Sequence, residues 1–317
     1  MADYRLVGVT DRFRDRITAA ATGMFKHAGY PLADTLSYRG DPGLFGPESV
    51  SWRVIGDISA FFGGIRALLM QAVHPEVAAG VSDHSRYRED PLGRLSRTSN
   101  YVTATTFGAM PEVTEAARIV RRIHQRVQGT SHRGIAYAAD VPDMAAWVHN
   151  ALTDGFLVAY QVFGPRPLSE AEADRYVVEQ MRVGALLGAD PMPETAAALA
   201  SWLGDHAAAG DSPGLQEAVQ FLRKPPLSFT VRIGYRVLFQ AAVATLPPRA
   251  RRTLGLRRHP GAITAGRLMA RFLRWALGAS PTWKLALVRV RAPIPDGMFR
   301  QPLPIDTLDG WGAGSVE

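Results

Sequence analysis

Apolar residues recur along this chain mainly with the spacing of helices. Very few stretches alternate with period 2, and the chain is rich in Ala, Leu and Arg, which favour helices. Gly and Pro residues divide the chain into roughly ten or more helical segments. The pattern predicts an all-α protein. So many apolar faces favour one continuous core, and hence a single helical domain over residues 1–317.

The predicted helices lie between recognisable start and stop signals. Residues 35–50 are a Gly- and Pro-rich loop, and the apolar run that follows, 51–73, predicts one buried helix ended by His74-Pro75. A short helix is predicted over 76–85, and the turn at Asp90-Pro91 precedes another helix. Further helices are predicted from Pro111 to Gly129, over 142–164, over 167–188 with a capping-box pattern at Ser169 and Glu172, and in two or three segments after residue 225.

Composition limits the chemistry. The chain of 317 residues is 47% hydrophobic and 21% charged, as in soluble globular proteins. It has no cysteine, which excludes disulfides, zinc fingers, cysteine nucleophiles and cysteine-ligated haem. No signal peptide is visible in the first thirty residues, and the apolar runs are too short or broken to span a bilayer, so the expected location is the cytoplasm.

Positive charge is concentrated near the C-terminus. The formal net charge is +7, and between Glu217 and Asp296 there are fifteen Lys and Arg but no acidic residue. This imbalance requires an anionic partner or a solvated basic face. The arginines of residues 218–295 are dispersed among apolar helical positions, which argues against nucleic-acid binding and leaves weak peripheral contact with anionic lipid as the alternative.

The usual enzymatic signatures are missing. The sequence has no Gly-rich phosphate loop, no nucleophile elbow and no metal-binding histidine pair on a helix. Arg94, Arg97 and Thr98 share one face of the helix that follows Pro91. Four histidines also lie on apolar faces or at their ends: His74, His84, His124 and His149. Each histidine alone is more typical of a satisfied core residue than of a ligand.

His124 stands on the apolar side of a helix crowded with arginines. The apolar stripe of that helix comprises Ala116, Ala117, Ile119, Val120, Ile123 and Val127. One neutral imidazole among apolar residues, with arginines nearby to pair with propionates, is what a b-type haem requires. The alternative is that the arginines simply solvate the outer face of the helix.

Three segments together resemble a known family. They are RALLMQAVHPEVAAGVSDHSRYREDPLGRLSRTSNYV, VRRIHQRVQG and YAADVPDMAAWVHNALTDG. Their order and spacing over about residues 50–240 resemble the MpaB-like oxygenases, which include the latex clearing proteins, rubber-cleaving haem b dioxygenases. Residues 241–317 are then expected to be a basic helical extension packed on this family core.

The resemblance implies roles for individual residues. The family's proximal haem histidine falls on His124, and the distal Arg-x-x-Lys-Thr motif of latex clearing proteins falls on Arg94, Arg97 and Thr98. Arg97 departs from the motif, because a guanidinium is effectively never deprotonated and cannot ligate iron. We therefore expect an open or water-filled sixth iron position, with Arg97 donating hydrogen bonds there.

Other residues are expected to support the cofactor. Arg121 and Arg122 are candidates for pairing with propionates. His74 is expected to organise the pocket through a hydrogen bond, and His149 is the alternative axial ligand if His124 is not. Trp147, Asp57 and Asp83 are weaker candidates, for which a core aromatic and two capping carboxylates are the favoured interpretations.

Together these observations predict a mainly helical haem b protein whose helices surround the cofactor in a globin-like way. The expected activity is oxygenation of an apolar, isoprenoid-like small molecule with dioxygen or peroxide. The alternative is a haem-binding carrier or sensor without catalysis, in which a second protein ligand such as His149 or His74 fills the sixth iron position.

Overall fold

The structure of the chain, a computed structural model, describes residues 12, 14–18, 32–85 and 91–301. Its elements, in chain order, are η1 (Thr35–Ser37), α2 (Val50–Gly56), α3 (Ala60–Ala72), α4 (Pro75–His84), α5 (Pro91–Phe107), α6 (Met110–His124), β1 (Gln128–Thr130), β2 (Ala136–Ala138), α7 (Pro142–Phe163), α8 (Glu170–Leu186), α9 (Ala196–Asp205), α10 (Pro213–Arg223), α11 (Phe229–Thr245), α12 (Pro248–Thr253), α13 (Ala262–Leu277) and α14 (Pro281–Arg289). The all-α prediction is confirmed, and the strands of the described part form one short antiparallel hairpin.

The prediction of one continuous helix over 51–73 is wrong. The structure divides it into α2 and α3, which are bent by 91° at the break. Asp57 causes the break: its carboxylate accepts the Ser59 N–H and pairs with Arg274 on α13 at 2.8 and 2.9 Å. Because Arg274 is 217 residues from Asp57 in the sequence, no local sequence pattern predicts the bend.

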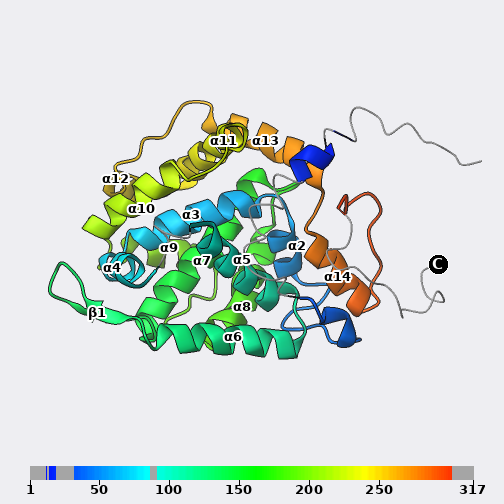
Figure 1. The fold of residues 1–317 in the computed structure, drawn as a ribbon, viewed down its shortest axis with the longest axis horizontal. Helices are drawn as coiled ribbons and strands as arrows, with labels where there is room; N and C mark the ends of the chain where they lie inside the picture. Colours follow the sequence, from blue (N-terminus) through cyan, green and yellow to red (C-terminus); the bar gives the residue numbers. More distant parts are fainter. Residues whose placement is uncertain (1–11, 13, 19–31, 86–90, 302–317) are drawn as a thin grey trace, which may run out of the picture.

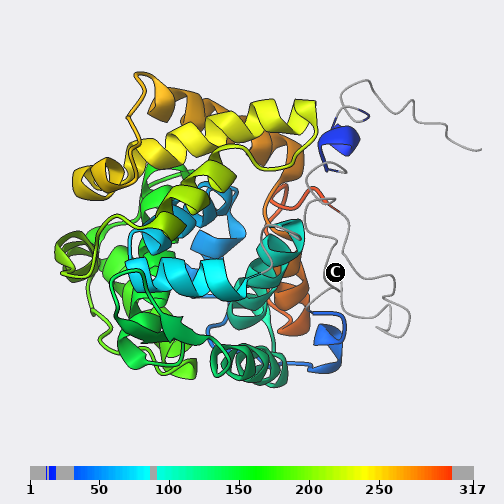
Figure 2. The same ribbon diagram turned by 60° about the vertical axis from the view of Figure 1, so that its left-hand side comes forward.

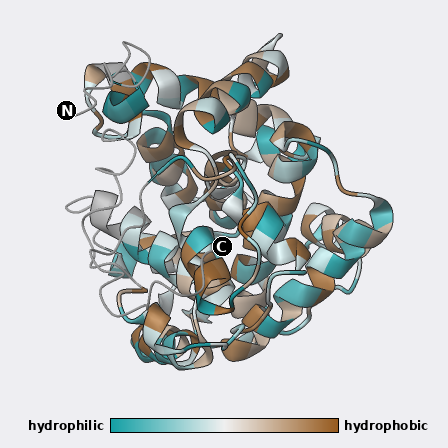
Figure 3. Cartoon of the chain, turned by 90° about the vertical axis from the view of Figure 1, so that its right-hand side faces the viewer, coloured by the Kyte–Doolittle hydropathy of each residue, from teal (hydrophilic) through white to brown (hydrophobic). Residues whose placement is uncertain are grey.

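Helices α3 and α7 form the centre of the molecule. They approach closely at two glycines, because a Cβ on Gly63 would lie 2.9 Å from the Phe156 Cα, and one on Gly155 would lie 2.8 Å from the Ala67 Cβ. The largest buried apolar cluster combines side chains of these helices with those of α2 and of α8 to α12. Most helices carry hydrophobic and hydrophilic residues in alternation along their length (Figure 3), as expected of helices that bury one face.

The outer helices cover this centre from several sides. In Figure 1, α11 and α13 lie across the top, α6 follows the lower edge, α14 stands at the right and the β hairpin projects at the left. The predicted boundary of the family core at residue 240 falls inside α11, whose last turns, including Ala241 and Val243, are buried.

Arg289 of α14 fixes the turn between α5 and α6. Its side chain is completely buried, and its guanidinium donates to the carbonyl oxygens of Phe107 at 2.8 Å and Asp41 at 2.7 Å. Glu112 caps the start of α6 by accepting the Ala109 N–H at 2.8 Å and the Thr35 hydroxyl at 2.9 Å. The turn between the two helices is therefore held rigidly from outside.

Within the described residues, no single helix has both the length and the apolar character needed to cross a membrane. The bent pair α2 and α3 meets that test only when the two helices are taken together.

Candidate active site

The predicted distal motif and the predicted proximal histidine lie on the two helices that leave this rigid turn. From the turn, α5 reaches toward the centre of the molecule while α6 follows its lower edge, so the two helices diverge (Figure 1). The distal motif lies near the start of α5 and His124 lies at the end of α6. Both therefore lie toward the ends of the two helices that are remote from the turn, and we call this diverging pair of helices the α5–α6 wedge.

One face of α5 carries the distal motif. Arg94, Arg97 and Thr98 share this face with Tyr101, which follows Thr98 by three residues. Thr98 is half-buried and Arg97 is exposed. Arg94 belongs to the first turn of α5 by its backbone, and its side chain lies outside the part of the chain that the structure describes.

Tyr101 is the unsatisfied polar group of the wedge. Its hydroxyl oxygen is buried, and no described residue forms a hydrogen bond with it. Burial raises the pKa of Tyr101, although the positive charge of Arg121 on α6 opposes the shift. Because buried hydroxyls in proteins nearly always have a partner, this neutral donor is available to a molecule that the chain itself does not supply.

His124 faces into the molecule from α6. It shares a helical face with Val113 and Ala117, the two fully buried residues of that helix. The predicted apolar stripe was too wide, because Ile119 and Ile123 are 46% and 51% exposed. Only one side of α6 packs against the protein, and His124 is on that side.

The imidazole of His124 is suited to act as a ligand. Burial lowers the pKa of His124, and the carboxylate of Asp140 opposes this only partly, so the ring is neutral at pH 7. None of the described residues hydrogen-bonds to the ring. A neutral imidazole keeps a lone pair on one nitrogen, which is the form that binds a metal ion.

The arginines of α6 take different positions. Arg121 extends from α6 to α8, where its Nε donates to the carbonyl oxygen of Leu186 at the end of that helix. Arg118 pairs with Glu115 on the outer surface, and Arg122 is exposed. Arg121 therefore lies close to Tyr101. Arg118 lies in solvent on the outer face of the helix, as the alternative interpretation of these arginines expects.

His149 lies within the packing between α7 and α8. Burial lowers its pKa to about 4, despite a hydrogen bond with the Gln180 backbone. Its Nε2 lies 3.4 Å from the Thr153 hydroxyl, and its ring fills the space over Gly184, where an added Cβ would be 2.8 Å away. These contacts favour a packing role over the alternative role of axial ligand.

His74 belongs to a different cluster, between α4, α7 and α9. Its ring packs at a tilt against the rings of Trp147 and His206, at centroid distances of 5.4 and 5.5 Å, and burial lowers the pKa of His74 to about 4. The expected organising hydrogen bond is absent among the described residues: Oε2 of Glu76 lies 3.4 Å from Nδ1, and neither ring nitrogen forms a hydrogen bond.

The weaker candidates have structural contacts. Trp147 is completely buried and donates to the Gln71 carbonyl oxygen at 3.3 Å. Asp57 accepts the Ser59 N–H at 2.8 Å just before α3 begins, and Asp83 accepts the Tyr137 hydroxyl at 2.6 Å. Sequence reasoning did not single out Tyr101, although its spacing from Thr98 places it on the same helical face.

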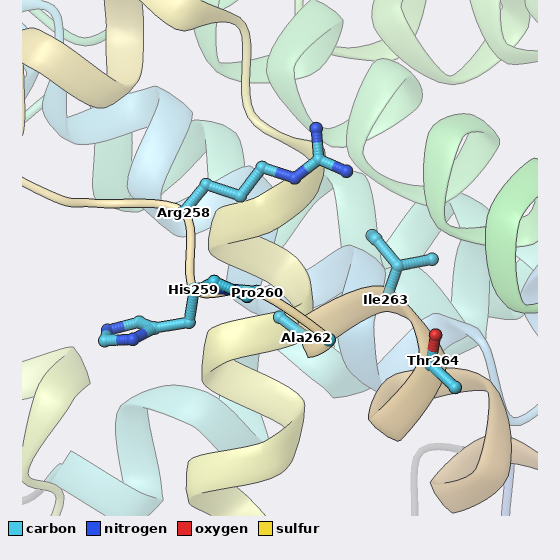
Figure 4. Close-up of a pocket in the computed structure, with 7 residues that line it drawn as sticks. Arg258, His259, Pro260, Ala262, Ile263 and Thr264 are labelled. Carbon is cyan, nitrogen blue, oxygen red and sulfur yellow. The ribbon is translucent and has the colours of Figure 1, made fainter.

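A separate concavity lies at the start of α13. It encloses about 370 Å³ and is lined by residues 258–264, with Arg258 and His259 extending away from each other on either side of the loop (Figure 4). None of the predicted site residues lines it. The described residues also include no group of three or more His, Asp or Glu side chains arranged to hold a metal ion.

The fold is mainly helical, and its candidate site combines His124 on α6 with the polar residues of α5. Comparison with known families then identifies it more closely. A profile of the family described as "ER-bound oxygenase mpaB/B'/Rubber oxygenase, catalytic domain" matches residues 52–275. The chain therefore belongs to this family of oxygenases, as the resemblance indicated. No curated protein and no solved structure matches the chain.

Proposed function

We propose that this protein is a haem b-dependent oxygenase that acts on a small apolar molecule, using dioxygen or peroxide. The observation that carries the proposal is the α5–α6 wedge. His124, whose pKa is lowered by burial, lies on the packed side of α6, and the adjoining helix α5 carries Arg97, Thr98 and the buried hydroxyl of Tyr101, which has no hydrogen-bond partner among the described residues.

The residues of the wedge fit such a cofactor. His124 would hold the iron through its neutral ring, and Arg121, whose positive charge acts on Tyr101, would pair with a propionate. Haem b, when bound, would supply the iron at which dioxygen or peroxide is activated. The absence of cysteine is consistent with a histidine ligand.

The chain's own residues would handle the oxygen and the substrate. Thr98 and Tyr101 carry neutral hydroxyl donors on one face of α5, and Arg97 carries a permanent positive charge. Fixed donors that point at developing negative charge stabilise it at little reorganisation cost. Apolar residues of the family core would exclude water from the reacting groups. By family resemblance, the substrate is an apolar alkene such as an isoprenoid.

The alternative of a haem carrier without catalysis requires a second protein ligand. Arg97 cannot provide one, because a guanidinium stays protonated. His149 is engaged with Thr153 and the Gln180 backbone, which argues against it. A carrier would bind haem without consuming dioxygen in the presence of any alkene.

The proposal is tested by reconstituting the protein with haem b and measuring dioxygen or peroxide consumption with a panel of isoprenoid alkenes. The Thr98→Ala variant should retain haem and lose about 100-fold or more of its turnover, the scale of one lost donor. Thr105→Ala is the matched control, because the Thr105 hydroxyl is committed to the Tyr101 carbonyl oxygen of its own helix at 2.9 Å. Equal turnover in wild type and Thr98→Ala would contradict the distal role.

A further inference from the structure

His74 and His206 bring two imidazole rings together, apart from the residues to which the proposed function assigns roles. Their ring centres are 5.5 Å apart and their planes are inclined by 49°. Trp147 packs against both rings, at centroid distances of 5.4 and 4.8 Å, and Trp202 packs against His206 at 4.7 Å. The side chains of His74 and His206 are only 4% and 13% exposed, so the protein encloses the pair almost completely.

Both histidines lie in connections between helices. His74 immediately precedes α4, and His206 immediately follows α9. The two connections are tied directly, because the Gly210 N–H donates to the Val73 carbonyl oxygen at 2.9 Å. Helices α4 and α9 lie on the left of the molecule in Figure 1, and Figure 2 is turned so that this side comes forward. The fold, rather than any local sequence motif, brings the two rings together.

Most of the ring nitrogens of this pair are buried without a hydrogen bond. They are both nitrogens of His74 and Nδ1 of His206, for which no described residue is a partner. Burial lowers the pKa of His74 to about 4, and burial also lowers the pKa of His206, although the carboxylate of Asp143 opposes the second shift. Both rings are therefore neutral at pH 7, and each keeps a nitrogen lone pair. Buried polar atoms without partners destabilise a fold, and a bound ligand would remove that cost.

Each histidine has a carboxylate beside one of its nitrogens. Nδ1 of His74 lies 3.4 Å from Oε2 of Glu76, and Nε2 of His206 lies 3.9 Å from Oδ1 of Asp143. The carboxylate of Glu76 is held in place by Arg133, which pairs with it at 2.5 Å. Metal-binding histidines commonly present one ring nitrogen to a carboxylate and the other to the ion. This pattern leaves Nε2 of His74 and Nδ1 of His206 as the two nitrogens available to a ligand.

We propose that His74 and His206 together bind one Zn²⁺ ion. Neutral imidazole nitrogen is a preferred ligand of Zn²⁺, whereas Mg²⁺ and Ca²⁺ prefer oxygen. Two rings that share a tetrahedral ion through Zn–N bonds of about 2.0 Å have their centres roughly 5 Å apart, close to the 5.5 Å observed. The part of the chain that the structure describes groups no third His, Asp or Glu ligand with this pair, so water would complete the coordination of the ion.

A packing role alone does not explain the pair. Phenyl rings would fill the space between Trp147 and Trp202 equally well without burying polar nitrogens. The exposed carboxylate of Asp143 beside His206 also gives a cation a route from solvent, since the Asp143 side chain is 57% exposed.

The bound ion would fasten the connection before α4 to the connection after α9. Because only the folded chain brings the two histidines together, Zn²⁺ should stabilise the fold. This inference goes beyond the proposed oxygenase activity and does not depend on haem or on His124, so the two stand or fall separately. It can be tested on the protein before any cofactor is added.

The test is calorimetric titration of Zn²⁺ into the metal-free full-length protein at neutral pH, together with thermal melts with and without Zn²⁺. Wild type should bind one ion per chain, and its melting temperature should rise with Zn²⁺. His74→Phe and His206→Phe each keep a ring in the cluster but remove its nitrogens, and each should lose this binding. The matched control is His259→Ala, which changes an exposed histidine elsewhere and should bind like wild type.

Asp143→Asn is the variant that decides the matter if the phenylalanine variants do not fold. It changes an exposed side chain and leaves both rings in place, and it should weaken Zn²⁺ binding about tenfold, because the carboxylate beside His206 is lost. Failure of wild type to bind Zn²⁺ would overturn the proposal. So would wild-type affinity in the phenylalanine variants or, if these do not fold, in Asp143→Asn, since the ion would then lie at other residues.

Discussion

The seam between α3 and α7 and the α5–α6 wedge use buried polar groups in opposite ways. In the seam, Arg66 is 3% exposed and its guanidinium pairs with the carboxylate of Asp154, and in the neighbouring packing between α7 and α8 His149 contacts Thr153 and the Gln180 backbone. In the wedge, the Tyr101 hydroxyl and the His124 ring find no hydrogen-bond partner among the described residues.

The difference distinguishes groups kept for stability from groups kept for a ligand. Burying a polar group without a partner costs about 1–3 kcal/mol, so a fold keeps such a group only where something else repays it. Burial alone would have pointed to His149 rather than to His124, which is half-buried. The state of the partners separates the two histidines.

The largest effect is expected in the seam. Asp154→Ala leaves the Arg66 charge buried without its carboxylate and should lower the free energy of unfolding by about 3–5 kcal/mol, measured by urea denaturation. The double variant Arg66→Met/Asp154→Leu removes both charges and should recover most of the loss. If the single variant cost less than about 1 kcal/mol, the seam would not depend on this pair.

A smaller effect is expected from pH. The pKa of His149 is lowered to about 4 in the folded protein, against 6.5 for a free side chain. Above pH 6.5 both states are neutral. Between 6.5 and 4 only the unfolded chain takes up the proton, so stability falls as pH falls, by about 2 kcal/mol at pH 5. His74, with its pKa also about 4, should add a comparable loss. His149→Gln should remove the His149 part, and an unchanged pH slope would contradict the assignment.

The smallest effect compares two buried tyrosines. Tyr235 donates its hydroxyl to the Leu222 carbonyl oxygen at 2.6 Å, and Tyr101 has no described partner. Tyr235→Phe should lower the free energy of unfolding by about 1 kcal/mol, while Tyr101→Phe should leave it unchanged or raise it slightly. Thermal melts of the two variants measure the contrast. A Tyr101→Phe variant that lost as much stability as Tyr235→Phe would show that its hydroxyl is paired after all.

The sequence predicted most helices because their ends carry local signals. Ser169 and Glu172 form the expected capping box at the start of α8, with both of its hydrogen bonds present. The break after α2 was missed because Asp57 is fixed by Arg274, far along the chain. Periodicity located the α6 helix but not the width of its buried side, which is set by the helices packed against it. Ile119 and Ile123 were therefore assigned to the wrong side.

The candidate site was predictable in part. The spacing of the distal motif and the family resemblance led to the two arms of the wedge, but their divergence depends on the turn held by Arg289 and Glu112. The unpaired state of Tyr101 is a property of the folded chain only. His206, beside His74, carried no signal in the sequence, because its cluster is assembled from α4, α7 and α9.

The most direct test of the central assignment is the absorption spectrum of the protein reconstituted with haem b, recorded in ferric and dithionite-reduced forms for wild type, His124→Ala and His149→Ala. We expect a Soret band in wild type that collapses in His124→Ala and persists in His149→Ala. A Soret band unchanged by His124→Ala, or none in wild type after reconstitution, would contradict the assignment of the α5–α6 wedge as a haem site.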